Sequence, residues 1–183
     1  MENKNISENN FINPEEVLAQ IDLQPGSVVA DFGCGSGYFV FPLARKLKDG
    51  GTVYALDVLK DKLEAIESQA KVSGLSNIIP RRANLEKDGG SNLEGESLDW
   101  VVIKDMLYQN RNKEIILREA KRVLKPEGRI ILIEWNSEDL SVGPESALRI
   151  SREKMAELVA ATGLKIEGEL SAGNYHYGLI VSK

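Results

Sequence analysis

Short runs of apolar residues alternate with amphipathic stretches along most of this chain. Continuous apolar runs of this length are typical of strands buried on both faces, whereas apolar residues at helical spacing indicate surface helices. The repeated strand–helix units predict an α/β fold, doubly wound, with helices on both faces of a mostly parallel sheet. The expected strands are 28–30, 52–56, 78–82, 98–103, 129–134, 164–170 and 177–181. The expected helices are one that begins at Pro14 and four that span 39–48, 60–72, 113–124 and 152–161.

Proline and glycine residues mark an edge of the expected sheet and its loops. Pro80 lies inside the third strand and has no N–H to donate, which favours an edge position for that strand. Residues 85–96 are polar and glycine-rich and predict a loop, and residues 126–128 predict a turn before the fifth strand. Only residues 171–174 join the last two strands, which leaves no room for a crossover helix, so we expect an antiparallel pair.

A single domain is expected over residues 13–183. The chain has 183 residues, and single domains cluster at roughly 100–200 residues. Asn13 is a suitable N-cap for the first helix, because Pro14 follows at the first helical position and Glu15 and Glu16 lie in the first turn. Residues 1–12 are mostly polar, and we expect them to form a flexible leader.

Composition narrows the classes of partner and compartment. Hydrophobic residues make up 42% of the chain, enough for a folded core, and the net charge of −5 disfavours duplex nucleic acid as a partner. Cys34 is the only cysteine and His176 the only histidine, so we expect neither an internal disulfide nor a metal site. The sequence has no signal peptide or apolar run long enough to span a membrane, and we expect a cytoplasmic protein.

A glycine-rich segment follows the first strand, the place where open α/β sheets bind nucleotides. Gly33, Gly35 and Gly37 allow the backbone to approach a ligand closely and to present N–H groups at a helix N-terminus. The dinucleotide fingerprint requires a third glycine where Tyr38 stands, and the lysine of a phosphate-binding Walker loop is absent. Asp31, just before the turn, would repel a pyrophosphate but suits a cationic group.

Asp57 ends the second strand, where a carboxylate accepts hydrogen bonds from both ribose hydroxyls in this architecture. Together with the glycine turn, it indicates an adenosine with a cationic or zwitterionic tail and no diphosphate. S-adenosylmethionine fits this description.

The chain resembles class I S-adenosylmethionine-dependent methyltransferases over nearly its whole length. Within them it is most similar to the small branch near the ubiquinone and menaquinone biosynthesis methyltransferases. The resemblance implies a Rossmann-like sheet of seven strands in the order 3-2-1-4-5-7-6, mostly parallel with an antiparallel last strand. The segments that carry it are ADFGCGSGYF (30–39), VYALDV (53–58), ANLE (83–86), SLDWVVIKDMLYQ (97–109) and REAKRVLKPEGRIILIEW (118–135).

The resemblance also implies cofactor-binding roles. Asp31 and the glycine turn would hold the methionine portion, with Lys104 beside the methionine amino group, and Asp57 would hold the ribose. Val58, the residue after Asp57, is also expected to bind the cofactor. Asn84 stands where relatives usually carry an aspartate that accepts from the adenine amino group, and its amide oxygen can accept the same bond. Leu85 would donate its backbone N–H to adenine.

Substrate-facing residues are expected at the carboxyl ends of the parallel strands. Asp105 and Tyr108 follow the fourth strand, and an antiparallel last strand begins at the same edge, which brings Tyr175 and His176 there. We interpret Asp105, Tyr108 and His176 as candidate catalytic residues. The cofactor supplies the reactive methyl group, so no nucleophilic side chain of the protein is needed.

Several functions remain open at this point. The favoured one is methyl transfer to a small molecule, with a pocket that is open or completed by a second subunit in a homodimer. The alternatives are methylation of RNA or protein, and a non-catalytic partner that binds S-adenosylmethionine. Tyr38 disfavours a nicotinamide-dependent oxidoreductase.

Overall fold

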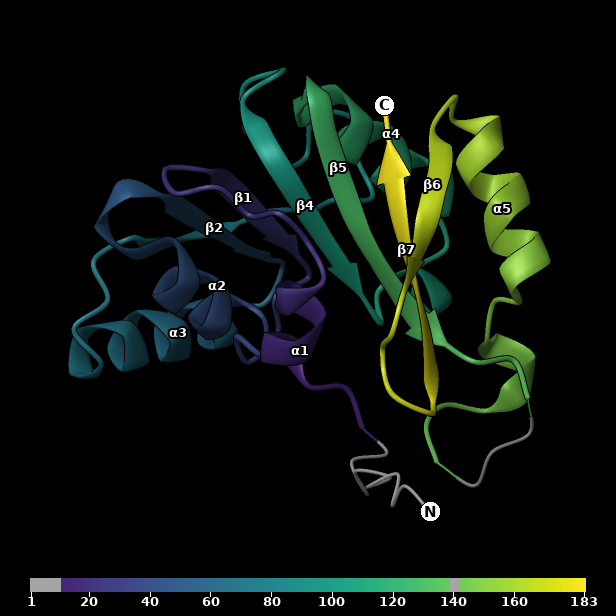
Figure 1. Cartoon of the computed structure of the whole chain (residues 1–183), viewed down its shortest axis with the longest axis horizontal. Coiled ribbons are helices and arrows are strands. Elements are labelled where there is room, and N and C mark those ends of the chain that lie inside the picture. The colour runs from purple at the N-terminus through teal and green to yellow at the C-terminus, as the bar shows by residue number, and fades with distance from the viewer. Residues whose placement is uncertain (1–10, 139–141) are drawn as a thin grey trace, which may run out of the picture.

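The structure of the protein is a computed structural model that describes residues 11–138 and 142–183. Its seven strands form one sheet in the order β3-β2-β1-β4-β5-β7-β6 (Figure 1). Strands β1, β2, β3, β4 and β5 pair in parallel with their neighbours among one another. Strand β7 is antiparallel to both of its neighbours, β5 and β6. The strands are β1 (Val28–Phe32), β2 (Thr52–Asp57), β3 (Ile78–Arg82), β4 (Leu98–Lys104), β5 (Leu124–Trp135), β6 (Lys165–Leu170) and β7 (His176–Ser182).

This sheet confirms the predicted α/β class and strand order, including the edge position of the strand that holds Pro80. The antiparallel pairing of the last two strands is also confirmed.

Helices cover both faces of the sheet. One hydrophobic core lies between the sheet and α1, α2 and α3, and the other lies between the sheet and α4 and α5. The helices are α1 (Pro14–Ala19), α2 (Val40–Leu47), α3 (Lys60–Val72), α4 (Lys113–Val123) and α5 (Arg152–Ala161), with 3-10 turns η1 (Lys48–Gly50), η2 (Leu107–Gln109) and η3 (Ser146–Leu148). Residues 83–97 connect β3 to β4 without a helix.

Side-chain caps begin two of the helices where the sequence predicts. The Asn13 side chain accepts hydrogen bonds from the N–H groups of Glu15 and Glu16 at the start of α1. At the start of α5 the Ser151 hydroxyl accepts from the Lys154 N–H. Each cap satisfies backbone donors that have no partner within the helix.

The fifth strand is longer than predicted, because β5 runs through residues 126–128, where the sequence predicts a turn. Its pairing with β4 shifts register between Leu98 and Trp100: Leu98 pairs with Leu124, and Trp100 pairs with Arg129. Residues 125–128 are therefore accommodated as an irregularity inside the strand. The turn prediction for this segment is wrong because the pairs that flank it, Leu98 with Leu124 and Trp100 with Arg129, keep residues 125–128 within β5 as a bulge.

The last two residues of the expected leader contact the domain that follows. Residues 1–10 of the expected leader lie outside the described residues, but Phe11 and Ile12 are described and pack on the domain. Ile12 is buried, and its carbonyl oxygen accepts a hydrogen bond from the Tyr38 hydroxyl. The Phe11 ring lies 5.1 Å from the Tyr175 ring, measured between centroids.

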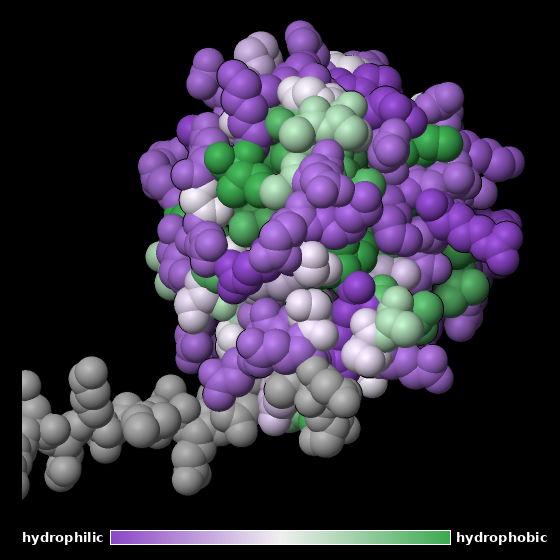
Figure 2. Space-filling model, turned by 90° about the vertical axis from the view of Figure 1, so that its right-hand side faces the viewer, coloured by the Kyte–Doolittle hydropathy of each residue, from purple (hydrophilic) through white to green (hydrophobic). Residues whose placement is uncertain are grey.

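Polar side chains cover most of the side of the molecule that carries α5 and β6, and hydrophobic groups gather there in small separate patches (Figure 2). Within residues 11–138 and 142–183, no helix is both long and apolar enough to cross a membrane.

The register of β5 and β7 decides which segments meet at the end of the sheet. Trp135, the last residue of β5, pairs with His176, the first residue of β7. Strands β1, β2 and β4 end at this same edge, because they are parallel to β5, and the segments that follow them begin there. The expected site segments are therefore brought together at one edge of the sheet.

Candidate active site

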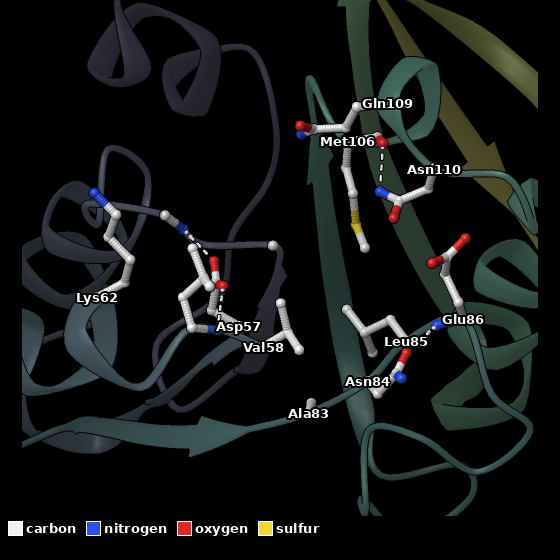
Figure 3. A pocket seen from close by; sticks show the side chains of 13 residues that line it. Asp57, Val58, Lys62, Ala83, Asn84, Leu85, Glu86, Met106, Gln109 and Asn110 are labelled. Carbon is white, nitrogen blue, oxygen red and sulfur yellow. Dashed lines mark hydrogen bonds between the residues drawn. The ribbon is translucent and has the colours of Figure 1, made fainter.

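Two neighbouring cavities lie at the carboxyl ends of the parallel strands. The larger of these two, the large cavity, has a volume of about 430 Å³ and lies at the ends of β1 to β4. In Figure 3, Asp57, Val58 and Lys62 lie on one side of it, and the segments around Asn84–Glu86 and Met106–Asn110 lie on the other. The cavity gathers six of the residues that the sequence predicts to bind the cofactor: Gly33, Gly35, Asp57, Val58, Asn84 and Leu85.

The Asp57 carboxylate ties the glycine turn to the end of β2. One carboxylate oxygen accepts from the Gly35 N–H at 2.9 Å, and the other accepts from the Leu59 N–H at 2.9 Å (Figure 3). A carboxylate offers about four acceptor positions, so each oxygen keeps capacity for a further donor. Asp57 can therefore hold the turn and accept ligand hydroxyls at the same time.

The three glycines of the turn serve different purposes. All three have left-handed backbones, with φ of 74° at Gly33, 51° at Gly35 and 86° at Gly37. A Cβ on Gly35 would meet nothing within 4 Å, so the space beside it is open. A Cβ on Gly37 would lie 2.6 Å from the Phe41 ring, and Gly37 does not line the large cavity. Gly37 thus serves the packing of α2, whereas Gly33 and Gly35 border the cavity.

The segment after β3 supplies the far wall of the cavity. Leu85 is buried, and among the residues that the structure describes none accepts a hydrogen bond from its N–H. The Asn84 side-chain oxygen accepts from the Glu86 N–H at 3.1 Å. The Leu85 amide is therefore available to a ligand, while the Asn84 oxygen already holds its own loop.

Two carboxylates that sequence reasoning did not select hold this loop. Glu86 accepts from the N–H groups of Arg111 and Asn112, both at 2.9 Å, and so joins the loop to the start of α4. Glu119 on α4 is buried and accepts from the N–H groups of Gly89 and Ser91, each at 3.1 Å. Both lie in segments that carry the family resemblance, but the sequence gives them no role, because their partners are backbone amides far away in the chain.

Glu119 is also paired with a cation. Although burial alone would raise its pKa, hydrogen bonds from Arg122 and Ser91 hold the pKa of Glu119 at about 2. Its charge is therefore part of what stabilises the loop.

A second pocket, of about 320 Å³, uses the same turn after β1 and the same segment after β4. Ser36 and Tyr38 come from the turn, Asp105 comes from the segment after β4, and Lys104 is the last residue of β4 itself. Its remaining lining residues are Phe11, Ile12, Trp135 and His176. This pocket has aromatic walls and a small cluster of charged groups.

Asp105 lies between Lys104 and His176. The Lys104 ammonium forms an ion pair with one Asp105 oxygen and lies 5.5 Å from the centre of the Tyr38 ring. The His176 Nε2 lies 3.1 Å from the other oxygen, but the ring N–H is not aligned with it for a hydrogen bond. Burial raises the pKa of Asp105, but the contacts with His176 and Lys104 outweigh it and hold the pKa below its usual value.

His176 is fixed by an aromatic neighbour. Its ring lies 4.0 Å from the Trp135 ring, and the Arg149 guanidinium lies 5.9 Å from the same tryptophan. The structure thus brings the predicted residues Asp105 and His176 together. Tyr108 is half-buried, packs against the core and lines neither cavity, and Tyr175 contacts Phe11.

Asp31 is buried at the end of β1 and lines neither cavity. Burial raises its pKa to about 7, with Lys104 opposing the shift and Asp57 adding to it. A buried acid with so high a pKa is sensitive to any new charge nearby.

The fold is that of a Rossmann-like α/β protein with a cavity where the strand order reverses on either side of β1, the place where such sheets bind ligands. Residues 23–173 match a family described as a methyltransferase domain, and the chain belongs to this family. The resemblance inferred from the sequence is thereby confirmed.

Curated relatives of this chain are named as methyltransferases. The chain is 27% identical to the nocamycin O-methyltransferase of Saccharothrix syringae over 85% of this chain and 56% of the relative. It is 28% identical to the demethylmenaquinone methyltransferase of Geobacillus kaustophilus over 69% of this chain and 53% of the relative. The chain thus spans about half the length of these curated relatives.

Solved structures share the fold over most of the chain. A SAM-dependent methyltransferase from Aquifex aeolicus superposes with a TM-score of 0.86 at 24% identity, covering 96% of this chain and 92% of that one. The O-methyltransferase NcsB1, solved with S-adenosyl-L-homocysteine and 1,4-dihydroxy-2-naphthoic acid, has a TM-score of 0.74 at 20% identity, over 90% of this chain and 51% of that one.

Proposed function

We propose that this protein is an S-adenosylmethionine-dependent methyltransferase that acts on a small molecule. The observation that carries the proposal is the cavity in which Gly33, Gly35, Asp57 and Leu85 converge. Membership of the methyltransferase family supports the same conclusion.

The residues of the large cavity fit the cofactor. Asp57 offers acceptors for the ribose hydroxyls, and the Leu85 N–H offers a donor for an adenine nitrogen. The space beside Gly35 is open, as close passage of a ligand requires. The charge of Asp57, joined by that of Asp31 when it is ionised, suits a cationic ligand and disfavours a diphosphate.

When bound, the cofactor supplies an electrophilic methyl group, so the protein has to orient the acceptor and exclude water. The second pocket is suited to this task because it shares the glycine turn and the segment after β4 with the large cavity. We place the methyl acceptor in this pocket, with Asp105 and His176 facing it. Tyr108 would act from outside the pocket, through the segment that it shares with Asp105.

A small acceptor fits the size of the pocket. Its volume of about 320 Å³ lies at the lower end of the range for small-molecule sites, roughly 300–1,000 Å³. The nocamycin and demethylmenaquinone enzymes are named for small-molecule acceptors as well.

The deciding experiment combines cofactor binding with label transfer. Calorimetry with S-adenosylmethionine measures binding, and incubation of cell extract with methyl-labelled cofactor measures transfer into small-molecule, lipid, protein and RNA fractions. We expect binding and enzyme-dependent label in the small-molecule or lipid fraction, above a Gly35→Val control. Label in protein or RNA would instead assign a macromolecular acceptor, and binding without any label would favour a non-catalytic partner.

A further inference from the structure

Glu134 carries a buried carboxyl group that has no assigned role in the proposed reaction. It is the next-to-last residue of β5 and is 0% exposed. Its Oε1 accepts hydrogen bonds from the Leu107 N–H at 2.6 Å and the Tyr108 N–H at 3.4 Å. The carboxyl therefore joins the end of β5 to the segment that follows β4.

That segment forms part of both cavities. Asp105 lines the smaller pocket, and Met106, Gln109 and Asn110 line the larger one (Figure 3). The Met106 side chain packs against the glycine turn, because a Cβ on Gly33 would lie 3.1 Å from its sulfur. A change in the path of residues 105–110 would thus alter both cavities together.

The segment depends on an external acceptor. Asp105 has a left-handed backbone, with φ of 51°, and the 3-10 turn η2 begins two residues later. The first amides of a helical turn have no partner within it, and Leu107 is 0% exposed, so water does not satisfy its N–H. Glu134 supplies the acceptor from a rigid, buried strand.

We propose that Glu134 is a positioning residue for methyl transfer, whose carboxyl fixes residues 105–110 and so shapes both the cofactor cavity and the acceptor pocket. This inference rests on the proposed function for its catalytic meaning. The hydrogen bonds and the burial of Glu134 carry it.

The protonation state of Glu134 fits the role of a neutral acceptor. Its Oε2 is buried and has no hydrogen-bond partner among the described residues. Burial and the charge of Asp105 raise the pKa of Glu134 to about 8, against the opposing effect of the two backbone N–H groups and Lys104. At pH 7 the carboxyl is then mostly protonated, and a glutamine would offer the same acceptor in the same shape. The titratable groups that interact with it are Asp105, Lys104, Tyr108 and Tyr177.

The test compares Glu134→Gln with Glu134→Leu in the full chain. Calorimetry with S-adenosylhomocysteine measures cofactor-site binding, and amide hydrogen exchange measures protection of the Leu107 and Tyr108 N–H groups. We expect Glu134→Gln to keep the Kd within about threefold, and Glu134→Leu to weaken binding by about tenfold or more, because its two amides lose their acceptor. Protection of both amides should fall in Glu134→Leu alone.

Asp99 provides a matched control at the opposite end of β4. It accepts from the Val28 N–H at 2.8 Å and lines neither cavity of the site. Asp99→Leu should lower the melting temperature without a comparable loss of S-adenosylhomocysteine binding. Two results would overturn the proposal: an equal loss of S-adenosylhomocysteine affinity in Asp99→Leu and Glu134→Leu, or unchanged affinity in a folded Glu134→Leu.

The remaining outcomes are equally decisive. If Glu134→Leu does not fold, the affinity of Glu134→Gln tests the proposal. A folded Glu134→Gln that binds S-adenosylhomocysteine about tenfold more weakly would contradict the role of a neutral acceptor. If the wild-type protein does not bind S-adenosylhomocysteine, the proposed function fails. Amide exchange at Leu107 and Tyr108 then still decides whether Glu134 fixes the segment.

Discussion

The Asp57 carboxylate and the Gly35 N–H are joined by a hydrogen bond of 2.9 Å on one side of the large cavity. This bond fixes the glycine turn of β1 against the end of β2. Under the proposed function Asp57 has two tasks, to hold the protein backbone and to accept hydroxyl groups of the cofactor. The consequences of its removal follow from both.

Replacement of Asp57 by alanine should weaken S-adenosylmethionine binding by about 1–3 kcal/mol, the usual cost of losing charge-assisted hydrogen bonds. Isothermal calorimetry measures the change. Asp61→Ala is the matched control, because Asp61 is an exposed acid in the first turn of α3. This variant should bind S-adenosylmethionine as tightly as the wild-type protein does. An unchanged affinity in Asp57→Ala would refute its assignment to the ribose.

Gly35→Val should abolish cofactor binding, since its side chain would enter the open space beside the turn. Gly74 offers a close control: it too has a left-handed backbone, with φ of 66°, and nothing within 4 Å of its Cβ position. Both valine variants carry comparable backbone strain and should lose similar stability in thermal denaturation. Only Gly35→Val should lose binding, and retention of binding there would exclude the turn from the cofactor site.

Cofactor affinity should rise between pH 6 and pH 8. The pKa of Asp31 is about 7 in the protein alone, and a cationic ligand nearby favours the ionised form, so binding releases a proton. Calorimetry in buffers of different ionisation enthalpy measures that proton. Asp31→Asn should flatten the pH dependence, and an equally steep profile in this variant would assign the titration to another group.

Asp31 should also affect stability with the opposite trend in pH. Its folded pKa lies above the unfolded value of 3.8, so the protonated acid favours folding at low pH and this contribution is lost as pH rises through 7. In the absence of ligand, the melting temperature of the wild-type protein should fall more between pH 5 and pH 8 than that of Asp31→Asn. An identical trend in both proteins would contradict the raised pKa.

The contribution of Glu119 to stability should depend on pH in the opposite sense, decreasing as the pH falls. Its folded pKa of about 2 lies below the ordinary value of 4.5, so the contribution is present above that value and is lost as pH falls toward 2. Glu119→Gln should cost about 1–3 kcal/mol at pH 7 and show a weaker loss of stability in acid. Chemical denaturation at pH 7 and pH 3.5 measures both, and equal acid sensitivity would count against the assignment.

Much of the fold follows from local sequence. The strand and helix order, the edge position of Pro80 and the caps at Asn13 and Ser151 rest on backbone preferences and periodicity, which act over a few residues. The glycine turn and Asp57 stand out for the same reason, because their spacing within one strand–helix unit is readable from the chain.

The tertiary structure alone decided which distant groups meet. Pairing with β4 on either side of residues 125–128 keeps this segment within β5, and the register of β5 with β7 brings His176 beside Asp105. Glu134 could not be selected from sequence, because its partners are the backbone amides of Leu107 and Tyr108, which carry no side-chain signal. Local preferences determined the elements of this protein, whereas contacts between residues far apart in the chain shaped its candidate site.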